Sequence, residues 1–189
     1  MSKKIYLDYQ ATTPVDPEIL EKMLPFFSVN FANPHSNNHQ DGRSANEVIE
    51  EARENVANLI NAQSSEIIFT SGATESNNLA LKSIAKNYFE NKCQIISCKT
   101  EHKCVLESCH ELEKEGFKVT YLDVDEEGLI NIDELENILK KEKSLVSIMM
   151  ANNETGVIQD VKKIGELCKK YTSIFHSDVA QSIGTQKID

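Results

Sequence analysis

Short apolar runs alternate with longer stretches of mixed polarity along most of this chain. A short apolar run bounded by turn residues is typical of a buried strand, whereas apolar positions three and four apart are typical of a helix. The pattern predicts strands at residues 66–70 (EIIFT), 94–97 (QIIS), 118–122 (KVTYL), 145–150 (LVSIMM) and 173–176 (SIFH).

The segments around these strands carry a helical period. They predict helices at residues 17–27, 44–61, 74–90, 102–115, 133–140 and 160–171. Asp16 followed by Pro17 marks a helix start, because aspartate caps free N–H groups and proline suits the first helical position. Gly116 marks a helix end. Residues 30–42, rich in Asn, His and Ser, are predicted to form a loop.

Strands that alternate with helices predict βα units and an α/β fold. Such units form a mostly parallel sheet flanked by helices on both faces. We expect this βα core at residues 44–189, preceded by an N-terminal segment at residues 1–30. Residues 184–189 carry no helix to cover the last strand, so we expect the domain to be truncated at the C-terminus.

Composition narrows the class of protein. The chain has 189 residues, of which 40% are hydrophobic and 26% charged, as in folded globular domains. The net charge of −10 disfavours binding to nucleic acid or to an anionic membrane surface. No secretory leader or membrane-spanning run is evident, so we expect a cytoplasmic protein.

The five cysteines do not predict a metal site. Their number is odd, no pair has the spacing C-x-x-C, and zinc ligands are usually more tightly paired. Free cysteine packs as a small hydrophobic residue. We therefore expect reduced, buried thiols and no metal.

Polar residues follow four successive predicted strands. The carboxyl ends of parallel strands meet at one edge of a sheet, where ligands bind. Residues 71–78 (SGATESNN) suit a phosphate at a helix N-terminus, although Ser and Thr there are more often plain helix caps. His102 suits a surface or capping role, and residues 151–156 a turn. Asp178 is either a cap or a buried carboxylate with a partner.

Five segments carry a resemblance to a known family: residues 6–14 (YLDYQATTP), 69–78 (FTSGATESNN), 99–103 (KTEHK), 152–156 (NNETG) and 178–182 (DVAQS). In these motifs and their order the chain resembles cysteine desulfurases of the NifS/IscS type. These are fold-type-I pyridoxal-phosphate enzymes related to class-V aminotransferases. The resemblance implies that this chain is the large, cofactor-binding domain without the small C-terminal domain.

The resemblance also implies roles for individual residues around pyridoxal 5'-phosphate. Ala73 and Thr74 would hold the phosphate. His102 would stack on the ring and handle protons, and Asp178 would pair with the ring N–H. Asn153 and Gln181 would hydrogen-bond the phenolic oxygen.

The activity implied is removal of sulfur from L-cysteine, giving L-alanine and a protein persulfide for iron–sulfur cluster assembly and other sulfur transfer. Members of the family bind the cofactor through a lysine in a Ser-x-His-Lys motif, and no lysine of this chain matches it. No cysteine here suits the persulfide-forming nucleophile, which needs an exposed loop. We therefore expect the isolated chain to be inactive.

Partners implied are a second subunit in a homodimer, a complementary C-terminal half and a sulfur-acceptor scaffold protein. Two alternatives remain open. The chain could be a non-catalytic fragment that pairs with a full-length homologue, or part of an enzyme related to selenocysteine lyase.

Overall fold

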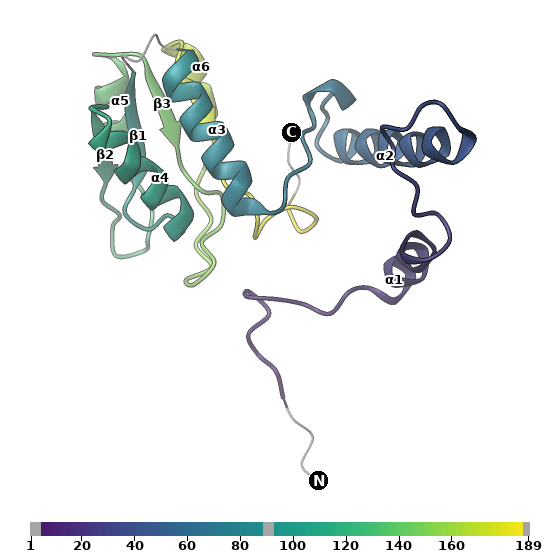
Figure 1. The fold of residues 1–189 in the computed structure, drawn as a ribbon. Coiled ribbons are helices and arrows are strands. Elements are labelled where there is room, and N and C mark those ends of the chain that lie inside the picture. The colour runs from purple at the N-terminus through teal and green to yellow at the C-terminus, as the bar shows by residue number, and fades with distance from the viewer. Residues whose placement is uncertain (1–4, 89–92, 187–189) are drawn as a thin grey trace. The chain divides into compact units, whose positions relative to one another are not determined.

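The computed structural model describes residues 5–88 and 93–186. Contacts divide them into two compact units, one of residues 5–69 with Gln186 and one of Thr70–Thr185 (Figure 1). In the described ranges no helix combines the length and apolar character needed to cross a bilayer.

Two α-helices and two short 3₁₀ helices make up the first unit: α1 (Pro17–Met23), η1 (Leu24–Phe27), α2 (Gln40–Leu59) and η2 (Ser64–Glu66). The predicted start signal of α1 is confirmed, since Asp16 Oδ1 accepts from the N–H of Glu18 at 2.8 Å. The helix predicted at residues 17–27 is α-helical only as far as Met23, and Leu24–Phe27 form a 3₁₀ turn.

Helix α2 begins inside the predicted loop, four residues before the predicted start at Ser44. His39 caps it, its Nδ1 accepting from the N–H of Gly42 at 3.1 Å. A Cβ at position 42 would lie 2.1 Å from the carbonyl oxygen of Ser36, so the preceding loop can pack against the helix only because this residue is glycine. An imidazole cap is rarer than Ser, Asn or Asp, and sequence patterns do not anticipate it.

The strand predicted at residues 66–70 is wrong. Gln63 and Glu66 form a reciprocal capping box around η2, and the backbone then becomes extended at Ile67 without entering a sheet. Ile68 and Phe69 are 70% and 51% exposed. An apolar run forms a strand only beside another strand, and no described residue of the chain pairs with this segment.

The second unit is the predicted α/β fold. Its sheet has the order β2-β1-β3-β4 and every pairing is parallel. The strands are β1 (Gln94–Cys98), β2 (Val119–Leu122), β3 (Ser144–Ser147) and β4 (Ile174–His176). The helices are α3 (Ala73–Asn87), α4 (Lys103–Lys114), α5 (Ile132–Leu139) and α6 (Val161–Lys170). The mostly parallel sheet flanked by helices is confirmed.

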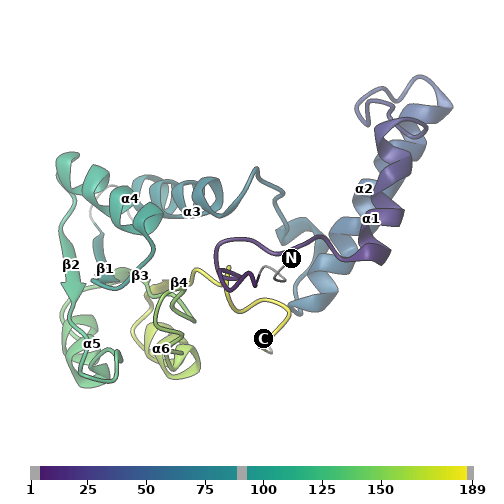
Figure 2. The ribbon, with the colours of Figure 1, turned by 90° about the horizontal axis from the view of Figure 1, so that it is seen from below.

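Alternate side chains of each strand enter two separate cores. Ile95 and Leu145 pack with α3 and α4, whereas Ile96 and Val146 pack with α5 and α6. Figure 2 shows the two pairs of helices on opposite faces of the sheet. Because both faces are covered, β1 and β3 are buried at every position, which explains the adjacent apolar residues at their centres, Ile95–Ile96 and Leu145–Val146.

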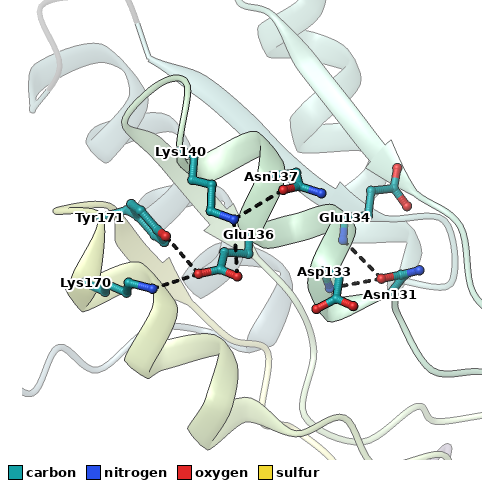
Figure 3. Close-up of polar contacts among 8 residues, drawn as sticks. All are labelled: Asn131, Asp133, Glu134, Glu136, Asn137, Lys140, Lys170 and Tyr171. Carbon is teal, nitrogen blue, oxygen red and sulfur yellow. Dashed lines mark hydrogen bonds and ion pairs between the residues drawn. The ribbon is translucent and has the colours of Figure 1, made fainter.

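Helices α5 and α6 are joined by polar contacts at the surface (Figure 3). Asn131 caps α5, its Oδ1 accepting from the N–H groups of Asp133 and Glu134. Glu136 Oε1 accepts from Lys170 Nζ and from the Tyr171 hydroxyl, both at 2.8 Å. These hydrogen bonds lower the pKa of Glu136 to about 2. The cluster lies on the α5–α6 face of the sheet, away from α3 and α4.

Helix α3 offers a matched test of the core that supports the sheet. Leu81 is fully buried in the α3–α4 core, whereas Leu79, on the same helix, is 43% exposed. We expect Leu81→Ala to lower the free energy of unfolding by about 3 kcal/mol, and Leu79→Ala by less than about 1 kcal/mol. Urea denaturation followed by circular dichroism measures both. Equal losses would contradict this assignment of the core.

Candidate functional site

Strands β1, β3 and β4 all end at one edge of the sheet, and helices α3 and α4 begin there. The candidate site is formed by the residues after these strands and by the first turns of the two helices. All of them belong to the second unit.

Asp178 follows β4 and is only 8% exposed. Its Oδ2 accepts from Asn77 Nδ2 at 2.8 Å, and its Oδ1 accepts from the N–H of Ala180 at 3.0 Å. Both alternatives predicted from the sequence therefore hold, because Asp178 caps the next turn and is also a buried carboxylate with a partner. Hydrogen bonds to both oxygens offset the cost of burying a charge.

His102 caps helix α4, as the simpler interpretation of the sequence predicted. Its Nδ1 accepts from the N–H of Cys104 at 3.2 Å and lies 3.0 Å from Cys104 Sγ. A backbone N–H can only donate, so Nδ1 of the neutral ring is an acceptor and the ring hydrogen is on Nε2. The His102 side chain is exposed, which leaves Nε2 accessible to a ligand.

Ala73 and Thr74 are the first two residues of α3, and both are exposed. The N-cap is Gly72, which has no side chain to take the first N–H groups of the helix. The nearby carboxylate of Glu75 accepts instead from Ser71, through its N–H at 2.7 Å and its hydroxyl at 2.6 Å. This helix N-terminus can therefore accept an anion.

Asn153 and Gln181 lie in the turns that follow β3 and β4. The first turn is fixed by Asn152, whose Oδ1 accepts from the N–H groups of Glu154 and Thr155 at 2.9 and 2.8 Å. Asn153 is half-buried in this turn, and Gln181 is exposed. The contacts of their neighbours place both residues at the same edge of the sheet as Asp178, and their roles stay predictions.

Glu101 is a buried carboxyl group that the sequence did not single out. It is 6% exposed, and its Oε1 accepts from the N–H of Met149 at 2.6 Å. Its Oε2 is buried and has no hydrogen-bond partner among the residues that the structure describes. Burial raises the pKa of Glu101 to about 8, with a further contribution from the charge of Asp178. Strand β3 ends at Ser147 and not at the predicted Met150, and the backbone N–H groups of Ile148 and Met150 still donate to the carbonyl oxygens of His176 and Asp178.

Glu101 also ties the loop after β1 to the loop after β3. A second bond, from Asn152 Nδ2 to the carbonyl oxygen of Thr100 at 2.7 Å, joins the same two loops. The loop that carries His102 is therefore held to the loop that carries Asn153.

Asn77 and Cys104 were also missed as members of the site. Asn77 lies within the motif at residues 69–78, which does not indicate a role for it, and Cys104 is one of the five cysteines predicted to be buried thiols. Asn77 Nδ2 contacts Asp178 Oδ2 and, at 3.2 Å, Cys104 Sγ. The only available signals were spacings: Asn77 lies one helical turn after Ala73, and Cys104 two residues after His102.

The five cysteines are all buried and free. Burial raises the pKa of Cys109 to about 11 and that of Cys168 to about 12. Among the described residues no group of three or more His, Cys, Asp or Glu side chains could hold a metal ion.

Comparison with known proteins identifies the family. Residues 5–189 match the family model described as aminotransferase class-V. The cysteine desulfurase IscS of Rickettsia africae (strain ESF-5) is 53% identical over 185 residues, which cover 98% of this chain and 45% of that protein. The chain thus spans about half the length of the curated relatives it matches.

Solved structures agree with the sequence match. A NifS-like protein superposes with a TM-score of 0.94 at 42% identity, over 99% of this chain and 52% of that one. SspA in complex with cysteine superposes with a TM-score of 0.92 at 42% identity, over 97% and 53% of the two chains. The family match, the parallel sheet and the polar residues at its carboxyl edge agree, and this chain belongs to the class-V aminotransferase family.

Proposed function

We propose that this chain is the cofactor-binding part of a pyridoxal-phosphate-dependent cysteine desulfurase, which removes sulfur from L-cysteine and leaves L-alanine. The observation that carries the proposal is the meeting of three groups at one sheet edge. These are a helix N-terminus without a side-chain cap, the buried carboxylate of Asp178 and the exposed imidazole of His102.

The residues present fit pyridoxal phosphate. The first turn of α3, with Ala73 and Thr74, would hold the dianionic phosphate, for which a helix N-terminus is well suited. Asp178 would accept from the pyridine N–H and keep that nitrogen protonated. Asn153 and Gln181 would donate to the phenolic oxygen. When bound, the cofactor supplies a sink for the electrons of the substrate α-carbon.

His102 would then hold or move a proton at Nε2. This nitrogen is suited to the role because Nδ1 is already engaged by the start of α4. L-cysteine as the substrate is supported by the names of the relatives and by the cysteine complex of SspA.

The lysine anchor and the persulfide-forming cysteine are proposed to come from outside these 189 residues. No lysine here matches the family motif, and a nucleophilic cysteine has to reach solvent, whereas all five cysteines are buried. A complementary C-terminal polypeptide, a dimer partner and a sulfur-acceptor scaffold for iron–sulfur assembly in the cytoplasm complete the proposal.

Complementation tests this function. The chain with pyridoxal phosphate and L-cysteine is expected to form no alanine by itself. Adding the remaining part of a related cysteine desulfurase as a separate polypeptide is expected to restore alanine and sulfide formation in the presence of a thiol. Alanine formation by the purified chain alone, or none from any such pair that co-purifies, would contradict the proposal. Selenocysteine as a second substrate tests the lyase alternative.

A further inference from the structure

Four polar side chains form a continuous series of hydrogen bonds that links two residues of the candidate site, Asp178 and His102. Asn77 Nδ2 lies 2.8 Å from Asp178 Oδ2 and 3.2 Å from Cys104 Sγ, and Cys104 Sγ lies 3.0 Å from His102 Nδ1. The series therefore runs from the end of β4, through α3, to the first turn of α4. Asn77 and Cys104 are 4% and 8% exposed, so its two middle members are shielded from water.

Counting hydrogens gives this series one consistent arrangement. The amide nitrogen of Asn77 carries two hydrogens, one for the carboxylate of Asp178 and one for the sulfur of Cys104. The Cys104 thiol then donates its own hydrogen to His102 Nδ1, whose single lone pair it shares with the backbone N–H of Cys104. If Nδ1 carried a hydrogen instead, the N–H of Cys104 would lose its acceptor. The arrangement thus uses both oxygens of Asp178 as acceptors and requires the ring hydrogen of His102 to be on Nε2.

We propose that Asn77 and Cys104 are positioning residues that couple the charge of Asp178 to the tautomer of His102. The inference rests on the proposed function, in which Asp178 and His102 contact the cofactor. Asn77 directs its amide nitrogen at Asp178 because a carboxylate can only accept. The same orientation presents its second hydrogen to the sulfur, which leaves the thiol hydrogen for Nδ1.

The alternative is that Cys104 only fills space at the start of α4. Cys109 provides a matched control, because it is a buried free thiol on the same helix. Cys104→Ala removes the donor to Nδ1, Cys104→Ser restores one, and Cys109→Ala removes a comparable side chain elsewhere. If Cys104 only fills space, the hydroxyl of Cys104→Ser will not restore what Cys104→Ala loses.

The experiment records ring nitrogen signals of ¹⁵N-histidine in the full chain without cofactor, with His102→Gln to assign the signals of His102. Cys104→Ala is expected to shift the tautomer ratio of His102 roughly five-fold away from Nε2–H, the effect of one neutral hydrogen bond. Cys104→Ser is expected to restore the parent ratio, and Cys109→Ala to leave it unchanged.

A second arm tests the coupling itself. Asp178→Asn is expected to move the His102 signals in the parent and Cys104→Ser backgrounds and to leave them unmoved in the Cys104→Ala background. If Cys104→Ala does not fold, Asn77→Ala replaces it in this experiment. That substitution removes the hydrogen bond between Asn77 and the sulfur of Cys104, and so breaks the same series of hydrogen bonds. Unchanged His102 signals in Cys104→Ala, or equal shifts in Cys109→Ala, overturn the proposal. Neither readout needs cofactor or turnover, so a failure of the proposed function is seen separately.

Discussion

Replacing Asp178 by alanine is expected to weaken pyridoxal phosphate binding by about 100-fold, the loss typical of a buried charge pair that loses one partner. The alanine removes the proposed acceptor for the pyridine N–H and also the acceptor oxygens that Asn77 and the N–H of Ala180 use. Cofactor absorbance titrations measure the affinity, for the chain alone and for the chain with its complementary polypeptide.

Asp178→Asn separates charge from shape. It keeps the size of the side chain, so binding is expected to fall less than in Asp178→Ala, whereas alanine formation by the complemented enzyme falls as far because the ring nitrogen is no longer held protonated. Asp123→Asn is the control, since Asp123 also follows a strand but is exposed and pairs with Lys99. Unchanged cofactor affinity in Asp178→Ala would remove the basis of the proposed site.

Replacing Glu101 by glutamine is expected to remove a large pH dependence of stability. The carboxyl group of Glu101 has a pKa near 4.5 in the unfolded chain and near 8 in the folded chain. Below pH 4.5 both states are protonated. Between these values only the unfolded state releases its proton, so the parent chain loses stability as the pH rises, and the loss is complete above about pH 8. The shift corresponds to a loss of ~5 kcal/mol.

The measurement is the free energy of unfolding of the parent and of Glu101→Gln at several values between pH 5 and pH 9. Glutamine keeps an oxygen for the N–H of Met149, so the loop contact is retained. The difference between the two proteins is expected to grow in favour of the variant as the pH rises. Glu127→Gln, at an exposed carboxyl, reports the effect of removing one charge. Parallel curves for parent and Glu101→Gln would show that Glu101 is not buried as described.

The sequence predicted the second unit well because its signals are local. Each apolar run from residue 94 onward lies beside another strand, so β1 to β4 formed within or next to the predicted segments, although β3 ended three residues before the predicted Met150. The run at residues 66–70 has equally suitable side chains, and it failed because strand formation also requires a neighbour. The start of α2 was missed because its cap is an imidazole, which only the folded loop brings into place.

The candidate site divides in the same way. The position of Asp178 at a strand end and of His102 at a helix start could be predicted, because both follow from the order of elements. Asn77 and Cys104 are 27 residues apart in sequence, and their contact depends on how α3 packs against α4. The burial of Glu101 could not be predicted either, since an acidic residue in a short loop is ordinarily solvated. Glu101 is buried only because of where the folded chain places this loop.

The cap on α4 gives the two nitrogens of one imidazole separate duties. Nδ1 has a structural role, because it caps the first turn of a helix that covers the sheet. Nε2 is the nitrogen to which the proposed function assigns proton transfer. A residue with a suitable oxygen at this position could preserve the architecture and abolish the reactivity, so the fold and the chemistry place independent constraints on the same side chain.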